Sequence, residues 1–334
     1  MKAARLHGVG DLRVDDEAPP SARAGEVMVR VTAVGLCGSD LHWFTEGAIG
    51  DATLTRPLVL GHELGGTIAE GPRAGQRVAV DPAVPCGTCE LCVEGHPNLC
   101  PQVRFAGHGA TDGGLRELVA WPEHRVHAVP DSLSDADVAM LEPLGVAIHA
   151  VDLSHPHVGG TVVVVGCGPI GLCALQVARA AGATRAVAVE PLAHRREAAA
   201  RWADVVLDPR ADGFEAELRD AVGPLGAHTV IECAGNDDAV ASSVEAARPG
   251  ATVVLAGIPD DDHTAFPAAH ARRKGLTFRM VRRMKDVYPR AIALVAGGHV
   301  DVRSLVTHTF ALDDAAKAFE VATAREGLKV VVAP

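Results

Sequence analysis

The sequence predicts an α/β protein in which a doubly wound parallel sheet is joined to a second, β-rich domain. The chain has 334 residues, more than the ~250–300 at which a single hydrophobic core usually stops growing. From about residue 146 short apolar strands alternate with helices, a pattern typical of a doubly wound sheet. The residues before it read as short strands separated by Gly and Pro turns. Only 3% of residues are aromatic, and the many Val and Ala residues suit buried parallel strands.

Composition argues against several classes of protein. The formal net charge is -11, and no dense block of basic residues occurs, so we expect no nucleic-acid partner. The apolar stretch 158–178 is interrupted by glycines and lacks the flanks of a membrane span, so we expect a strand feeding a helix and no membrane partner. The start of the chain lacks the apolar core of a signal peptide. Eight cysteines then favour metal or redox use in a reducing compartment, and we expect a cytoplasmic protein.

In the β-rich part the clearest strand covers residues 26–34, which are rich in β-branched side chains and follow Pro19, Pro20 and Gly25. This strand should bring Cys37 to the end of its sheet. A further strand is expected at 76–80, before Asp81 and a proline.

In the second half of the chain we predict the following alternating strands and helices, given in chain order. Residues 161–165 form a buried strand, and residues 169–181 form a helix that Gly182 ends. Further strands are expected at 186–190, 203–207, 228–233 and 252–256, with helices at 195–202 and 238–247. Near the end of the chain an apolar face predicts a helix around 315–322 that Asp313 can cap, and residues 328–332 a last strand.

Four cysteines, Cys86, Cys89, Cys92 and Cys100, lie within fifteen residues and are separated by turn-forming residues. Four thiolates at such spacing can complete a tetrahedral zinc shell with no open position, which indicates a structural metal site. Four cysteines also hold iron–sulfur clusters, so the spacing alone leaves that alternative open.

A glycine-rich turn, Gly166-Cys167-Gly168-Pro169-Ile170-Gly171, follows the first strand of the second half directly and opens a helix. In this context the glycines permit a tight turn, close approach to a pyrophosphate and packing of the helix on the sheet, as in a Rossmann domain. Glu190 ends the next strand, where a carboxylate can bind the ribose 2′-hydroxyl. It would repel a 2′-phosphate, so NAD is favoured over NADP. Arg195 could lie over the adenine or could approach a 2′-phosphate.

A second metal site is predicted from residues 37–63 together with Glu142. Cys37 and His62 are good zinc ligands, and Glu63 or Glu142 could complete a catalytic set of three. One thiolate and one carboxylate already balance Zn²⁺, so we expect Glu63 to bind directly and Glu142 to act through the metal's water. The ordinary alternative is a buried thiol with imidazoles bonded to backbone carbonyls.

At these motifs the chain resembles the zinc-dependent medium-chain alcohol dehydrogenases over essentially its whole length. Glu142 stands where a second cysteine ligand is common, which is typical of the polyol branch of sorbitol dehydrogenase and its relatives. Segments 46–51, 57–63, 288–292 and 305–308 agree with that branch. The resemblance implies a GroES-like catalytic domain at 1–146 with the zinc lobe at 86–100, a Rossmann domain at 147–283, and a return at 284–334. It also implies a homodimer or homotetramer.

The same resemblance implies roles in substrate binding. Arg283 would hold substrate hydroxyls, Phe105 would cover the substrate or would instead be a core residue, and the Met at 284 replaces the branch's tyrosine. As a hypothesis for the mechanism, hydride would pass from a secondary alcohol to NAD, and the hydroxyl proton would leave through Ser39, two residues after Cys37, and His42. The ordinary alternative is a turn residue at Ser39 and a packed surface imidazole at His42. A threonine or amino-alcohol dehydrogenase and a noncatalytic NAD-binding relative remain as alternatives. Cys167, Cys173 and Cys233 read as small apolar residues.

Overall fold

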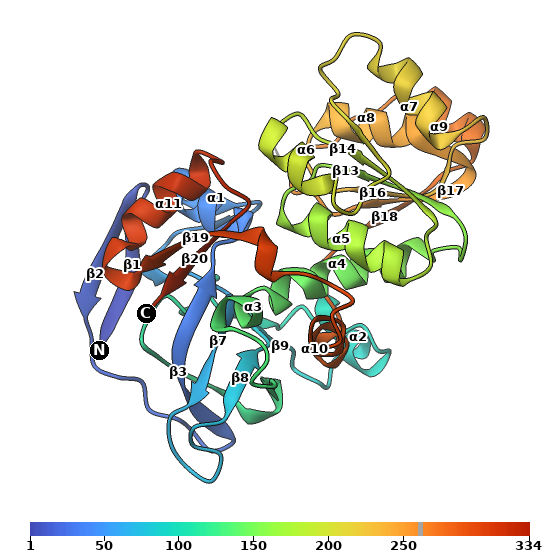
Figure 1. Ribbon diagram of the computed structural model, residues 1–334. Helices are drawn as coiled ribbons and strands as arrows, with labels where there is room; N and C mark the ends of the chain where they lie inside the picture. The colour runs from blue at the N-terminus through green and yellow to red at the C-terminus, as the bar shows by residue number, and fades with distance from the viewer. Residues whose placement is uncertain (260–262) are drawn as a thin grey trace. The chain divides into compact units, whose positions relative to one another are not determined.

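The computed structural model describes residues 1–259 and 263–334 (Figure 1). It contains two compact units, one made of Met1–Glu142 with Tyr288–Pro334 and the other of Pro143–Val287. The chain passes between them in the first turn of α4 (Leu141–Ser154) and at the start of α10 (Tyr288–Ala296). Both ends of the chain therefore belong to the first unit.

The first unit is built around a seven-stranded sheet with the order β12-β8-β7-β3-β20-β19, on which β11 also pairs with β3. Its strands are β3 (Glu26–Gly35), β7 (Glu63–Ile68), β8 (Arg77–Val80), β11 (Leu118–Pro122), β12 (Val126–Ala128), β19 (Val306–Ala311) and β20 (Lys329–Ala333). The central strand β3 confirms the strand expected at 26–34, and β8 confirms the one at 76–80. β20 comes from the far end of the chain and pairs with β3, so the sheet needs both terminal segments.

Smaller elements surround this sheet. A three-stranded sheet holds β1 (Lys2–Gly8), β2 (Asp11–Asp16) and β6 (Leu58–Val59), and two short hairpins hold β4 (Ala48–Ile49) with β5 (Ala52–Thr53) and β9 (Ala83–Val84) with β10 (Arg104–Phe105). The helices are α1 (Gly38–Glu46), α2 (Glu90–Val93), α3 (Asp135–Ala139), α10 and α11 (Ala315–Thr323). Short 3₁₀ turns cover Pro97–Leu99, Glu123–Arg125, Arg303–Leu305 and Leu312–Asp314. Trp43, Trp121 and Phe319 are among the largest buried side chains of this unit's core.

The expected cap of the last helix is wrong. The residue that caps α11 is Asp314, and its side chain makes no capping hydrogen bond. Asp313 instead accepts hydrogen bonds from the Lys2 ammonium group at 2.6 and 2.8 Å. The 3₁₀ turn Leu312–Asp314 that precedes α11 moves the helix start by one residue, so the Asp313 carboxylate is free to pair with the other end of the chain.

The second unit is a six-stranded parallel sheet with the order β15-β14-β13-β16-β17-β18. Its elements are β13 (Thr161–Val165), β14 (Arg185–Val189), β15 (Val205–Leu207), β16 (Ala227–Glu232), β17 (Ala247–Leu255), β18 (Thr277–Met280), α4, α5 (Pro169–Ala180), α6 (Ala193–Ala199), α7 (Phe214–Val222), α8 (Asp237–Ala246) and α9 (Ala268–Lys274). The strand order reverses between β13 and β16, so the carboxyl ends of those two strands form the edge where such sheets bind ligands.

All five strands and all three helices expected in this unit are present, with ends shifted by a few residues. The apolar stretch 158–178 is the strand β13 followed by α5, as expected. The helices α4, α7 and α9 and the strand β18 were not predicted from the sequence. In the part of the chain that the structure describes, no helix is both long and apolar enough to cross a bilayer.

Candidate metal centre and cofactor site

Three potential zinc ligands meet at one end of the sheet of the first unit. Cys37 follows β3 and occupies the N-cap of α1, while His62 and Glu63 stand at the start of β7. β3 and β7 pair with Gly35 opposite Glu63, which brings the two segments together. The Cys37 sulfur, a His62 ring nitrogen and a Glu63 carboxylate oxygen all lie within 4.8 Å of one another. A soft thiolate, an imidazole and a carboxylate at this spacing fit the donor set of a catalytic zinc ion.

Asp40 holds this ligand group in place, and the sequence analysis missed it. Its fully buried carboxylate accepts hydrogen bonds from the backbone N–H groups of Cys37 at 3.0 Å and Gly61 at 3.1 Å. Its Oδ1 also lies 3.5 Å from Nδ1 of His62, the arrangement by which a carboxylate fixes the ring of a metal-binding histidine. The signal was available, because an acidic residue three positions after an N-cap often bonds back to the N-cap backbone.

The charges of these groups depend on one another. Burial alone would lower the pKa of His62, but Asp40 and Cys37 outweigh it and raise the pKa well above the ordinary value. Burial alone would raise the pKa of Asp40, but His62 and the two backbone N–H groups lower it instead. In the metal-free protein the pair is therefore an ion pair, and a metal ion must displace the His62 proton.

Glu142 and Lys329 add charges next to the ligand group. Glu142 lies in the first turn of α4 and is 4% exposed. Its pKa is raised to about 7, chiefly by burial, with His62 acting to lower it and Glu63 to raise it. Lys329, at the start of β20, forms a buried ion pair with Glu63. Burial lowers the pKa of Lys329, but Glu63 and Cys37 produce a net increase. The sequence analysis did not identify Lys329.

Other predicted residues lie in different surroundings. The ring of Phe105 lies 5.2 Å from that of His62, between centroids, and Phe105 is only partly buried outside the main core. Ser39 and His42 are three residues apart on α1, and Nδ1 of His42 is 2.9 Å from Oε1 of Glu46. These positions are compatible with a substrate contact at Phe105 and a proton path along α1.

Arg283 and the Met after it belong to the second unit. Arg283 adopts a left-handed conformation with φ of 53°, which is uncommon for a residue with a side chain. Met284 is buried, and a methyl group added to Gly145 would overlap its sulfur. Met284 therefore packs against α4.

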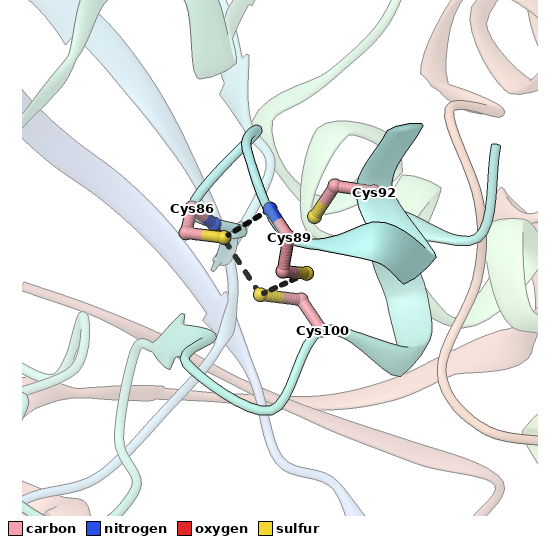
Figure 2. A group of neighbouring side chains, drawn as sticks. All are labelled: Cys86, Cys89, Cys92 and Cys100. Atoms are coloured by element: carbon pink, nitrogen blue, oxygen red, sulfur yellow. Dashed lines mark hydrogen bonds between the residues drawn. The ribbon is translucent and has the colours of Figure 1, made fainter. Parts of the chain in front are cut away.

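The four cysteines of the lobe form a second ligand group (Figure 2). Their sulfurs lie within 4.8 Å of one another, and the sulfurs of Cys89 and Cys100 are 3.9 Å apart. Backbone N–H groups of Thr88 and Cys89 lower the pKa of Cys86 to about 6, whereas burial and the neighbouring thiols raise that of Cys92 to about 12. Four thiols this close together can all lose their protons only when a cation compensates for the negative charge. This requirement fits a closed metal shell.

The glycine turn of the second unit fits a dinucleotide. Gly166 has φ of 90°, and a side chain on Gly171 would overlap the Gly166 carbonyl oxygen, so both positions require glycine. A Cβ on Gly168 would meet only the Arg195 guanidinium, at 3.5 Å, which leaves its backbone open to a phosphate. Pro169 and Ile170 form the first turn of α5, whose N-terminus favours an anion.

Glu190 follows β14 and is buried beside this turn. Its Oε2 accepts a hydrogen bond from the backbone N–H of Cys167 at 2.7 Å, and its Oε1 accepts one from Leu192 at 2.9 Å. The carboxylate is therefore fixed next to the glycine turn, with further lone pairs available for a ligand hydroxyl. Cys167 and Cys173 are buried and Cys233 is partly buried, in agreement with their expected role as small apolar residues. Burial raises the pKa values of Cys167 and Cys233.

Two thiol-containing ligand groups and a dinucleotide turn define a class, the zinc- and nicotinamide-dependent dehydrogenases. Comparison with known proteins agrees. Residues 23–131 match the model of the alcohol dehydrogenase GroES-like domain, and residues 169–297 match that of the zinc-binding dehydrogenases.

Two relatives and one solved structure illustrate the similarity. The chain is 34% identical to a sorbitol dehydrogenase of Bacillus subtilis, with 100% of this chain and 97% of the relative covered. It is 36% identical to a probable D-xylulose reductase A of Arthroderma otae, with 98% and 96% covered. The structure of L-idonate 5-dehydrogenase from Escherichia coli matches with a TM-score of 0.93 and 25% identity, covering 100% and 98%.

The chain belongs to the zinc-dependent medium-chain alcohol dehydrogenase family, in its sorbitol dehydrogenase-like branch. It is an oxidoreductase that acts on CH–OH groups, and its cofactors are zinc and a nicotinamide dinucleotide. The threonine-type and noncatalytic alternatives are not favoured by these relatives.

Proposed function

We propose that the protein reversibly oxidises a secondary hydroxyl of a polyol or a related sugar derivative, with zinc as its catalytic metal and NAD as hydride acceptor. The observation that carries this proposal is the cluster of Cys37, His62 and Glu63, whose ligand atoms lie within 4.8 Å of one another. The names of the relatives, sorbitol dehydrogenase and D-xylulose reductase, supply the polyol class.

Cys37, His62 and Glu63 would hold the catalytic zinc, and Asp40 fixes the His62 ring. When bound, zinc supplies a Lewis acid that lowers the pKa of the substrate hydroxyl, and NAD supplies the acceptor of the hydride. Phe105 would cover an apolar face of the substrate, given its position against His62. Arg283 would donate hydrogen bonds to further hydroxyl groups, and this multiple donation would favour polyols over simple alcohols.

The hydroxyl proton must leave the substrate before the hydride can be transferred, because the alkoxide is the hydride donor. We assign its first step to Ser39, two residues after the Cys37 ligand, and its exit to His42 on the same helix. The contact of His42 with the exposed Glu46 carboxylate gives the imidazole a second partner toward solvent. Such a pair can accept a proton on one side and release it on the other.

The glycine turn 166–171 would bind the pyrophosphate, and Glu190 would accept a hydrogen bond from the ribose 2′-hydroxyl. The fixed carboxylate of Glu190 supports NAD over NADP, because it would lie close to a 2′-phosphate of the same charge. Arg195, whose guanidinium faces Gly168, would cover the adenosine.

A substrate panel tests this function. The zinc-loaded protein would be mixed with NAD or NADP and with polyols, sugars, simple alcohols or threonine, and formation of the reduced cofactor would be followed by absorbance. We expect turnover with polyols and NAD, and none in a Cys37→Ser control that keeps the four-cysteine lobe. Turnover of threonine alone, or none with any alcohol despite bound zinc, would contradict the proposal.

The order of the two glutamates has its own test. We expect Glu63→Gln to lose the catalytic zinc in metal analysis, because it removes a direct ligand. Glu142→Gln should keep the zinc and lower turnover, because it acts through the water on the metal. Loss of zinc in the Glu142 variant with retention in the Glu63 variant would reverse the order.

The cellular location and the oligomeric state complete the proposal. No cysteine forms a disulfide among the residues that the structure describes, which suits a reducing compartment, and we place the protein in the cytoplasm. The family resemblance supports a homodimer or homotetramer. Light scattering on the purified protein would measure the oligomeric state directly.

A further inference from the structure

One buried cation lies at the metal centre and has no part in the mechanism above. Lys329 is 3% exposed, and its carboxylate partner Glu63 is 1% exposed. Removing an ammonium group from water costs several kcal/mol unless a partner compensates for it. A lysine at such a position therefore requires a strong local reason, and here that reason is the Glu63 carboxylate.

The fold provides a specific place for this pair. β3 lies between β7, which starts at Glu63, and β20, which starts at Lys329. Gly35 of β3 stands opposite both strands in the register. A Cβ atom on Gly35 would overlap the Glu63 carboxylate and would lie 2.9 Å from Cε of Lys329. The ion pair thus occupies the volume that any other residue at position 35 would fill.

The charges around the metal position explain why a cation is useful there. With zinc bound, the Cys37 thiolate and the ionised Glu63 and Glu142 carry three negative charges. Zinc compensates for two of them, and Lys329 compensates for the third. Asp40 adds one more charge, but two backbone N–H groups and the His62 ring already stabilise it.

We propose that Lys329 is a positioning residue of the catalytic zinc site, which holds one side of the Glu63 carboxylate and neutralises the additional negative charge that Glu142 brings. Lys329 thereby weakens the hold of the site on zinc and keeps the metal an effective Lewis acid. The inference rests on the proposed function, because it requires zinc at Cys37, His62 and Glu63.

If Lys329 acts through its charge, its removal should change the rate of zinc release in the opposite direction from the change expected for a purely structural role. Without a nearby cation, Coulomb attraction between the site and a divalent ion increases, so zinc should leave more slowly. The extra negative charge also makes the bound metal a weaker Lewis acid, so turnover should fall. If Lys329 only supported the local structure, its removal would loosen the ligands and zinc would leave faster.

The experiment compares Lys329→Met, Lys329→Arg and Lys274→Met with the wild-type protein at mildly alkaline pH. Release of zinc to an excess of a chromophoric chelator is timed, and kcat and KM for the best polyol are measured. Cys37→Ser identifies the release phase that belongs to the four-cysteine lobe. Lys274 is a matched control, since it is a partly buried lysine of the second unit whose ammonium group bonds the Val244 and Glu245 carbonyls at 2.9 and 2.7 Å.

We expect Lys329→Met to release the catalytic zinc about tenfold more slowly and to lower kcat about tenfold, with a smaller change in KM. Lys329→Arg should behave like the wild type, and Lys274→Met should alter neither quantity. Release from Lys329→Met at the wild-type rate or faster would overturn the inference. Failure of the proposed function would show separately, as a wild-type protein without the zinc phase that Cys37→Ser removes.

A second pair of variants keeps the inference testable if Lys329→Met does not fold. Glu63→Gln removes a ligand and leaves the Lys329 ammonium uncompensated near the metal, so zinc added back to this variant should bind weakly and leave fast. The double variant Glu63→Gln with Lys329→Met removes both buried charges and should hold zinc more tightly than Glu63→Gln alone. A double variant that loses zinc at the same rate or faster than Glu63→Gln would refute the charge role.

Discussion

Glu142 should make the first unit less stable as the pH rises when the catalytic metal is absent. Burial raises the pKa of this carboxyl group from 4.5 to about 7 in the folded protein. Between these values the folded state keeps a proton that the unfolded state has lost, so unfolding releases a proton and becomes easier at higher pH. A difference of about 2.5 pKa units corresponds to about 3 kcal/mol of unfolding free energy, lost as the pH rises through this window.

The assay compares Cys37→Ser with Cys37→Ser combined with Glu142→Gln, because the serine removes a ligand of the catalytic zinc and leaves the four-cysteine lobe intact. Urea unfolding would be followed by the fluorescence of Trp43 and Trp121, both buried in the first unit. Glutamine does not titrate, so the variant with Glu142 should lose about 3 kcal/mol more between about pH 5 and pH 8. Stabilisation by His62, whose pKa is raised, is also lost as the pH rises in both proteins.

The result that would refute this reasoning is a pair of parallel pH profiles. Parallel profiles would mean that Glu142 titrates in the folded protein at its ordinary pKa and that water reaches its carboxyl group. If the unfolding free energy fell more steeply with rising pH in the Glu142→Gln variant, the ionised carboxylate of Glu142 would be stabilised by its surroundings. The same comparison can be made with Cys37 intact and zinc bound. The difference in pH dependence between the protein with Glu142 and the Glu142→Gln variant should then be smaller, since a nearby dication favours the ionised carboxylate.

Three further predictions concern the other parts of the site. Gly171→Ala should weaken NADH binding at least tenfold in a fluorescence titration and leave the zinc content unchanged, because its methyl group would displace the Gly166 carbonyl; unchanged NADH affinity would contradict the assigned turn. Cys100→Ser should lose the lobe's zinc in metal analysis and lower the melting temperature, and a full zinc content would exclude a four-cysteine shell. His42→Ala should lower kcat most at mildly acidic pH, where solvent base is scarce, with Glu46→Gln less affected; an equal loss at every pH would exclude a proton path through His42.

Features set by short spacings could be predicted from the sequence. The four cysteines and the glycine turn each lie on one short segment, so their spacing alone brings their atoms together. The parallel sheet followed from apolar strands that are hydrophobic on both faces. By contrast, α7 has only Leu218, Ala221 and Val222 buried among charged residues, and such a narrow apolar face is hard to distinguish from a loop.

Features set by strand pairing could not be predicted. The ion pair between Glu63 and Lys329 joins residues far apart in the chain, and it exists because β7 and β20 both flank β3. No sequence spacing encodes that neighbourhood. Asp40 is an intermediate case, since its bond to the Cys37 backbone is local but its contact with His62 depends on the register of β7 against β3. Asp313 shows the opposite error, because a local capping rule missed its partner Lys2 at the other end of the chain.

Lys329 also changes the argument about which glutamate binds the metal. From the sequence, charge alone argued that a second carboxylate at zinc would make the site net negative, so only one glutamate could bind directly. A buried ammonium group beside Glu63 supplies the missing charge, and Glu63 and Glu142 can then both be ionised. The charge balance therefore no longer decides which glutamate binds zinc directly, and the positions of the carboxylate oxygens must decide it. Glu63 has an oxygen within 4.8 Å of the Cys37 sulfur and a His62 nitrogen, whereas Glu142 lies outside that group among the described residues. The position of the oxygen atoms thus supports Glu63 as the direct ligand, for a reason different from the one that first suggested it.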